Sequence, residues 1–115
     1  MLAAGCGIFG SKKGGSSYGR GGQVEFEAAY RMILEGQYKE ATTALAALAE
    51  TKAARNTRRP DAMFWLAYAY AEQGVTLEAG LWYRRYLEKY PDHRYAPAAR
   101  DRLKELEQAA FGPRE

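Results

Sequence analysis

The chain has 115 residues, of which 47% are hydrophobic and 27% are charged, a composition typical of one soluble globular domain. Its net charge of +3 comes from Lys12, Lys13 and Arg20, because the other 14 of its 17 Lys and Arg residues are balanced by 14 Asp and Glu residues. This balance argues against a dedicated nucleic-acid-binding domain, and no run approaches the roughly 20 apolar residues needed to span a bilayer.

Residues 1–6 read MLAAGC, in which small residues lead to the only cysteine of the chain. They resemble a bacterial lipobox, which implies that Cys6 carries a lipid and that residues 1–5 are a signal remnant. The basic start and apolar region that precede a lipobox are missing from the sequence as given, so we expect that it has either lost its beginning or starts at a misassigned methionine. Because Gly7 rather than aspartate follows the cysteine, the resemblance also implies an outer-membrane anchor that faces the periplasm. In the alternative interpretation, Cys6 is a free thiol in a disordered tail.

Residues 6–22 are rich in Gly and Ser, which predicts a flexible, disordered tether rather than part of a core. Its basic residues would lie beside anionic lipid headgroups. The tether lacks the strand, the Gly-Lys-Ser/Thr ending and the helix that a phosphate-binding loop requires. Its three serines cannot be held next to a base, so none is a candidate nucleophile.

From residue 23 onward, apolar residues recur at helical spacing, and strand-like alternation is absent. The pattern predicts an all-α fold with five helices, at residues 23–35, 38–53, 60–73, 76–90 and 95–110. Gly36 and Gly74 follow the first and third helices, where glycine relieves the left-handed conformation that ends a helix. Pro60 fits a first helical turn, and Pro91 fits the end of a helix.

A displacement of 38 residues brings the first two predicted helices onto the third and fourth. The matching pairs are Phe26 and Phe64, Ala29 and Ala67, Tyr30 and Tyr68, Gly36 and Gly74, Glu40 and Glu78, and Ala41 and Ala79. So many matches at one offset indicate two copies of a helix hairpin.

Two stretches, EGQYKEA at residues 35–41 and WLAYAYAEQG at residues 65–74, resemble tetratricopeptide repeats. The resemblance implies a domain at residues 23–111, a short α-solenoid. It has repeats at about 23–53 and 60–91 and a C-terminal capping helix at about 95–110. The family period is about 34 residues, and the loop at 54–59 accommodates the longer spacing. The resemblance assigns repeat-packing positions to Ala29, Gly36, Ala41, Ala67, Tyr70, Gly74, Ala79, Tyr83 and Pro91.

In this family, the first helix of each hairpin lines a concave groove that binds a peptide or helix of a protein partner. Carried over position by position, the groove contains Phe26, Tyr30, Ile33, Leu34, Phe64, Tyr68 and Glu72. Aromatic side chains suit this role because they offer a large contact area with few rotors to immobilise. The same side chains could instead pack under the capping helix or the tether. Because repeat stacks usually need about three units, we also expect homo-oligomerisation or docking to a larger complex.

His93 is the only histidine, so no histidine cluster for a metal can form, and its place in a proline-marked loop predicts a solvated turn residue. We therefore expect no catalytic residue, no metal and no cofactor. The segment YPDHRY at residues 90–95, with the helix after it, is similar to repeats of envelope lipoproteins of the barrel-assembly and Tol-Pal-associated type.

This similarity implies a non-catalytic scaffold, anchored through Cys6, that recruits proteins to an outer-membrane or cell-wall assembly complex. A soluble cytoplasmic adaptor with the same repeats is the alternative. A nucleic-acid binder using Arg55, Arg58 and Arg59 is a third possibility, although the balanced charge predicts no nucleic-acid partner.

Overall fold

The computed structural model describes residues 22–52 and 56–111, and within these ranges it contains five α-helices and no strand. The helices are α1 (Gln23–Leu34), α2 (Tyr38–Glu50), α3 (Arg59–Glu72), α4 (Thr76–Lys89) and α5 (Ala96–Phe111). The all-α prediction is confirmed, and each predicted helix has a counterpart at nearly the same bounds. Cys6, the predicted signal remnant and nearly all of the predicted tether lie outside the described residues.

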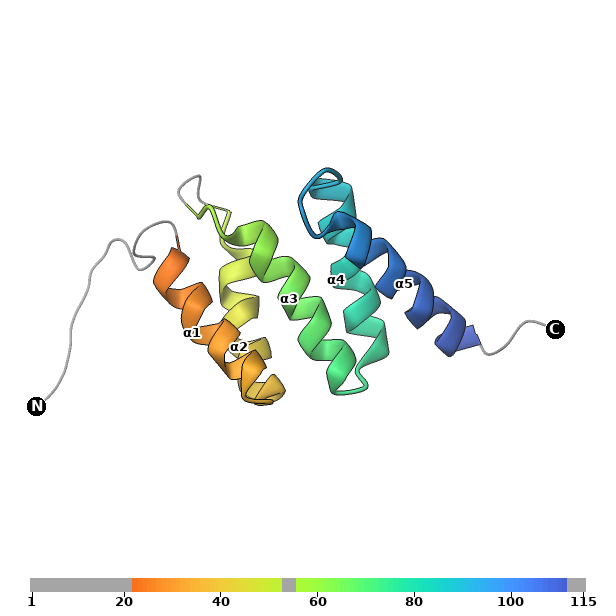
Figure 1. Ribbon diagram of the computed structural model, residues 1–115, viewed down its shortest axis with the longest axis horizontal. Helices are drawn as coiled ribbons and strands as arrows, with labels where there is room; N and C mark the ends of the chain where they lie inside the picture. The colour runs from red at the N-terminus through yellow and green to blue at the C-terminus, as the bar shows by residue number, and fades with distance from the viewer. Residues whose placement is uncertain (1–21, 53–55, 112–115) are drawn as a thin grey trace, which may run out of the picture.

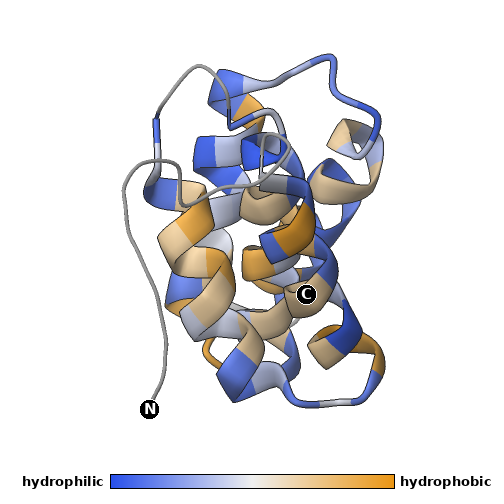
Figure 2. Cartoon of the chain, turned by 90° about the vertical axis from the view of Figure 1, so that its left-hand side faces the viewer, coloured by the Kyte–Doolittle hydropathy of each residue, from blue (hydrophilic) through white to orange (hydrophobic). Residues whose placement is uncertain are grey.

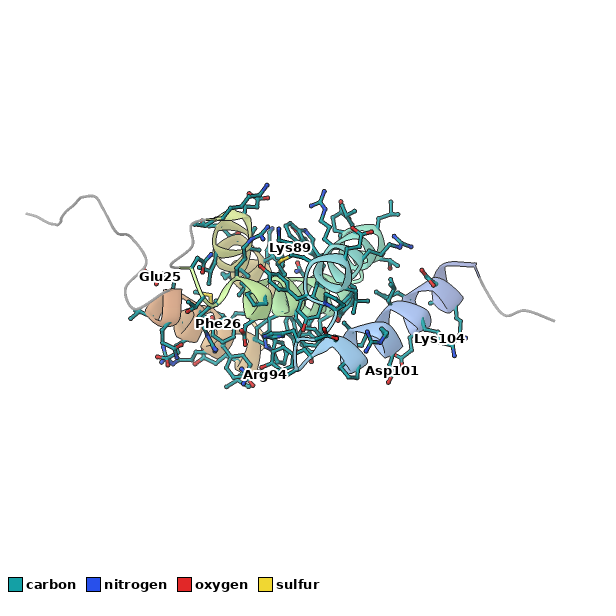
Figure 3. All side chains as sticks on the ribbon, turned by 90° about the horizontal axis from the view of Figure 1, so that it is seen from above. Glu25, Phe26, Lys89, Arg94, Asp101 and Lys104 are labelled. Carbon is teal, nitrogen blue, oxygen red and sulfur yellow. The ribbon has the colours of Figure 1, made fainter. Side chains whose placement is uncertain are left out.

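The helices lie side by side in chain order, and each packs mainly against the helices that precede and follow it (Figure 1). Seen from above, α2 and α4 lie on one side and α1 and α5 on the other, with α3 between them (Figure 3). Lys89 lies on the first side, whereas Phe26 and Arg94 lie on the second. We refer to these two sides as the α2/α4 face and the α1/α3/α5 face.

Small residues lie where the helices meet, and large ones fill the space between them. The fully buried alanines include Ala29, Ala41, Ala67 and Ala79, and the largest fully buried side chains are Tyr83, Tyr86, Leu45, Leu48 and Leu66. Alanine lets two helix backbones approach closely, and the larger side chains then interlock around the contact. Hydrophilic residues dominate the connecting loops (Figure 2).

The predicted packing positions differ in how deeply they are buried. The four alanines and Tyr83 are fully buried, and Tyr70 is half-buried against the core. Pro91 is exposed, which corrects its assignment as a packing residue. It lies directly after Tyr90, the C-cap of α4, where a residue without a backbone N–H cannot continue the helix.

The turns after α1 and α3 have the same conformation and the same hydrogen bonds. Gly36 and Gly74 both have φ 78°, in the left-handed region. In the first turn, the backbone N–H of Gly36 donates to the carbonyl of Ile33 (3.0 Å), and that of Gln37 donates to the carbonyl of Met32 (2.8 Å). In the second turn, Gly74 donates to Ala71 (3.0 Å) and Val75 donates to Tyr70 (2.9 Å). This is the Schellman pattern, and its four bonds obey the 38-residue offset found in the sequence.

The end of α2 is the one helix boundary whose predicted position differs from the observed one by more than one residue. Helix α2 ends at Glu50, three residues before the predicted position. The Nδ2 atom of Asn56 donates to the carbonyls of Leu48 and Thr51, each at 2.8 Å, and Nε of Arg59 donates to the carbonyl of Ala49 at 2.7 Å. These side chains satisfy carbonyls that a longer helix would have paired internally.

Glycine-to-alanine substitutions should have opposite effects on stability in the turns and inside a helix. We expect Gly36→Ala and Gly74→Ala each to lower the free energy of unfolding by about 1 kcal/mol, because alanine is disfavoured at positive φ. Gly80→Ala, inside α4, should raise it by about 0.5–1 kcal/mol, since the new Cβ would meet Leu103 at an ordinary 3.8 Å. Urea denaturation followed by circular dichroism measures all three, and effects of one sign would contradict this account.

Candidate functional site

Four half-buried aromatic rings from three segments of the chain form a continuous group on the α1/α3/α5 face. We call this group the aromatic strip; it consists of Tyr30 on α1, Trp65 and Tyr68 on α3, and Tyr95 directly before α5. Trp65 contacts the other three edge-on, at ring-centroid distances of 5.1 Å to Tyr30, 5.1 Å to Tyr68 and 5.8 Å to Tyr95. Edge-to-face contacts of this kind are the favoured geometry for aromatic pairs.

The aromatic strip rests on two phenylalanines of the core. Phe26 stacks on Tyr30 with centroids 5.9 Å apart, and Phe64 stacks on Tyr95 with centroids 4.7 Å apart. Both phenylalanines are only 4% exposed. The rings of the strip are therefore supported from below by close-packed side chains, so little rotational freedom remains to be lost when a partner binds.

Polar groups lie at the Tyr68 end of the aromatic strip. The guanidinium carbon of Arg102, on α5, lies 4.9 Å from the centroid of the Tyr68 ring, and Tyr38 packs edge-on against the same ring. Burial, with further contributions from Glu72 and Tyr38, raises the pKa of Tyr68. Its hydroxyl therefore stays protonated at neutral pH, and the strip ends in a hydroxyl group, a cation and the exposed carboxylate of Glu72.

The structure divides the predicted groove into a buried part and an accessible part. Tyr30 and Tyr68 lie in the strip, and Leu34 and Glu72 are exposed at the ends of α1 and α3. Three residues that were predicted to line the groove are instead buried in the core between the helices: Phe26 (4% exposed), Ile33 (6%) and Phe64 (4%).

Trp65, Tyr95 and Arg102 belong to this site, and the sequence reasoning did not include them. Trp65 corresponds to Glu27 under the 38-residue offset, so the internal repeat gives no signal for it. Tyr95 reaches the site from the α4–α5 connection and Arg102 from α5, neither of which has a counterpart in the repeats. The spacing of Trp65 and Tyr68, one turn apart on α3, was the available signal.

A buried carboxylate holds the α4–α5 connection against the start of α3. Asp61, in the first turn of α3, is 3% exposed. Arg94 donates to its Oδ2 at 2.9 Å, Nη1 of Arg58 lies 3.5 Å from the same oxygen, and Nε2 of His93 lies 3.6 Å from Oδ1. A buried carboxylate requires such partners, since an unpaired one would be strongly destabilising. The contact with Arg94 fixes the neighbouring Tyr95 in the aromatic strip.

His93 is not the solvated turn residue that the sequence predicted. Its side chain is 22% exposed, its Nδ1 lies 2.6 Å from the Tyr86 hydroxyl, and its ring packs edge-on against Tyr86 and Tyr95. Burial lowers the pKa of His93, and the nearby Arg94 and Arg58 lower it further, against the opposite effect of Asp61. The tertiary contacts of this connection could not be read from a loop sequence.

The Asp61, His93 and Tyr86 side chains form a line of polar groups, but the two ends of the line are buried. Burial raises the pKa of Tyr86 to about 12, so its hydroxyl stays protonated and donates to Nδ1 when the imidazole is neutral. That tautomer places the proton of Nε2 toward Asp61. Because Tyr86 and Asp61 are inaccessible, this arrangement positions the α4–α5 connection rather than presenting a reactive atom.

The described residues do not bring together three His, Cys, Asp or Glu side chains that could share a metal ion. None of the helices in this part of the chain is long and apolar enough to cross a membrane. Two of the three arginines considered for nucleic-acid binding are engaged within the protein. Arg58 pairs with Asp61 and lies over the Phe26 ring, and Arg59 bonds to the Ala49 carbonyl and the Tyr90 hydroxyl. Arg55 lies outside the described residues.

Comparisons with known proteins name no relative of this chain: no family model, no curated protein and no solved structure matches it. The aromatic strip and the repeated turns are therefore the features of the chain that bear on its function.

His93 should make the stability depend on pH. Because the folded-state pKa is lowered, the unfolded chain binds a proton first, and the free energy of unfolding should fall as the pH drops from about 7.5 through about 6.5 toward the folded-state pKa. Urea denaturation at several pH values measures this slope. Since His93 is the only histidine, the His93→Gln variant should show no slope between pH 7.5 and 5.5, and an unchanged slope would contradict the assignment.

Proposed function

We propose that this chain is a tetratricopeptide-repeat protein, a short α-solenoid of two repeats with α5 as the capping helix. The observation that supports the repeat is the 38-residue offset shared by the turn conformations, the turn hydrogen bonds and the adjoining helix ends. Leu34 and Glu72 end α1 and α3, and Tyr38 and Thr76 begin α2 and α4, with the same offset. The exposed charged residues of α5 suit a terminal helix that no further repeat covers.

The function that the geometry favours is that of a non-catalytic scaffold whose aromatic strip binds a peptide or helix of a protein partner. Tyr and Trp side chains are enriched among the residues that contribute most to protein interfaces. The four rings of the strip are half-buried and supported by the core, so they offer contact area at low entropic cost. Arg102 and Glu72 add polar groups at one end that could fix the direction of a bound peptide.

The location that we propose is the periplasmic face of an outer membrane, with a lipid anchor on Cys6. This assignment is supported by the lipobox-like residues 1–6 and by the Gly/Ser-rich tether after them. A cytoplasmic adaptor with the same binding surface is the second candidate. Nucleic-acid binding through the arginine-rich connection is less favoured, because Arg58 and Arg59 already have partners within the fold.

Replacement of the strip residues should weaken partner binding without unfolding the chain. A photoreactive side chain introduced at Leu34, beside the strip, should cross-link a defined polypeptide in the native cell. Tyr30→Ala and Tyr68→Ala should each reduce the amount of cross-linked product about tenfold. This is the loss of affinity expected when an aromatic residue at the centre of an interface is removed. Tyr70→Ala is the matched control, because residues 68 and 70 lie about 200° apart around α3.

The control should keep most of the cross-link, and circular dichroism should confirm that all three variants are folded. If Tyr70→Ala abolishes the cross-link as strongly as the strip variants, or if the strip variants retain it, the aromatic strip is not the binding surface.

Cell fractionation tests the proposed anchor separately from the binding surface. The chain expressed with its native upstream region should sediment with membranes, and Cys6→Ser should move it to the fraction free of membranes, because a thioether-linked lipid is no longer possible. Equal sedimentation of both forms would contradict lipidation, and release of both would favour the adaptor alternative.

A further inference from the structure

A second site candidate lies on the α2/α4 face, opposite the aromatic strip. A cleft of about 550 Å³ opens between the end of α2, the start of α3 and the second half of α4. Its lining residues are Glu50, Lys52, Arg59, Met63, Trp82, Arg85, Glu88 and Lys89. This volume falls within the range of about 300–1,000 Å³ that is usual for binding pockets.

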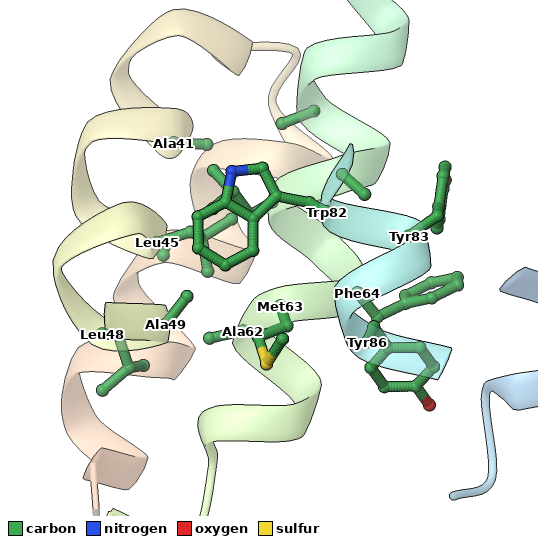
Figure 4. Close-up of a cluster of buried hydrophobic side chains, with 14 of the residues drawn as sticks. Ala41, Leu45, Leu48, Ala49, Ala62, Met63, Phe64, Trp82, Tyr83 and Tyr86 are labelled. Atoms are coloured by element: carbon green, nitrogen blue, oxygen red, sulfur yellow. The ribbon is translucent and has the colours of Figure 1, made fainter. Parts of the chain in front are cut away.

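The floor of the cleft is apolar and belongs to the core. Met63 and Trp82 are both buried, and Trp82 extends from α4 toward Leu45 of α2 (Figure 4). The guanidinium carbon of Arg85 lies 4.9 Å from the Trp82 ring centroid, on the rim of the cleft. An apolar side chain of a partner would therefore meet a preformed surface there, with charged groups around it.

The rim of the cleft has an excess of positive charge. Four basic side chains line it, against the two carboxylates of Glu50 and Glu88, and none of these six groups forms an ion pair with another described residue. Arg59 is held in place by hydrogen bonds to the Ala49 carbonyl and the Tyr90 hydroxyl, whereas Lys52, Arg85 and Lys89 are exposed. Like charges concentrated around a cleft favour an anionic partner.

We propose that this cleft binds an acidic peptide segment of a protein partner. Its carboxylates would face Lys52, Arg85 and Lys89, and an apolar side chain between them would contact Met63 and Trp82. Charge complementarity with an apolar anchor gives this surface a ligand different from that of the aromatic strip, so the proposal goes beyond the function proposed for the other face.

The lining favours a peptide over a nucleic acid. Trp82 is 8% exposed and the Arg85 guanidinium lies over its ring, so no whole face of the ring is open for a base to stack on, and a partner's side chain would reach only the part of Trp82 that lines the cleft. Every unit of a phosphate backbone is charged, so a nucleic acid would bring phosphates close to Glu50 and Glu88, whereas an extended peptide can place uncharged N–H groups there as hydrogen-bond donors and its carboxylates beside the basic residues.

Fluorescence anisotropy on the full chain tests the proposal with a labelled, blocked peptide of sequence Leu-Glu-Glu-Leu-Glu-Glu-Leu at low ionic strength. We expect saturable binding that the glutamine analogue of the peptide does not show. The double variant Arg85→Gln/Lys89→Gln should weaken binding about tenfold, since each exposed charge contributes up to about fivefold. The double variant Arg100→Gln/Lys104→Gln, on the exposed side of α5, loses the same charge and should change the affinity less than twofold.

Several results would overturn the proposal. These are no binding of the acidic peptide, equal binding of its glutamine analogue, or equal losses in the two double variants. Tighter binding of a labelled oligothymidylate, lost on Arg85→Gln/Lys89→Gln, would assign the cleft to nucleic acid instead. Weaker peptide binding on Tyr68→Ala would place the peptide on the aromatic strip. An unchanged affinity there supports the cleft whether or not the strip binds a partner of its own.

Discussion

The contact between Asp61 and Arg94 is the interaction on which the α1/α3/α5 face depends. It joins the first turn of α3 to the connection before α5, 33 residues away in the chain. With Arg94 fixed, the adjacent Tyr95 stacks on Phe64 and contacts Trp65, which completes the aromatic strip. A carboxylate that is almost fully buried is stable only with such charged partners, so the contact that stabilises Asp61 also places Tyr95 in the aromatic strip.

The two hairpins have the same backbone conformation at their turns but differ in the side chains that they present at the surface. The turn hydrogen bonds repeat with the 38-residue offset, and so do two pairs of fully buried alanines, Ala29 with Ala67 and Ala41 with Ala79. The hairpins differ at both tryptophans: Trp65 stands where the first hairpin has Glu27, and Trp82 where it has Ala44. The divergent tryptophans lie in the aromatic strip and on the floor of the cleft, so both candidate sites depend on features of the second repeat.

The helices and the Gly36 and Gly74 turns could be predicted because they depend on local spacing and backbone conformation. The site was predicted only in part. Equivalence between the hairpins does not show which side of a helix is covered: Phe26 and Phe64 are core residues, whereas the equally matched Tyr30 and Tyr68 lie half-buried in the aromatic strip. The end of α2 depends on the side chain of Asn56, six residues beyond the last helical residue, and periodicity carries no information about such a contact.

Helix α3 explains how one small domain can support two different surfaces. Its residues from Asp61 to Ala69 are buried on nearly all sides, so packing rather than solvent fixes their orientation. The helix contributes Trp65 and Tyr68 to the aromatic strip and Met63 to the floor of the cleft on the other side. Because a close-packed helix resists local deformation, it holds both surfaces in a fixed arrangement. The aromatic strip and the cleft are therefore separated by a layer of buried α3 side chains, so the two proposed ligands would meet different surfaces of the same helix.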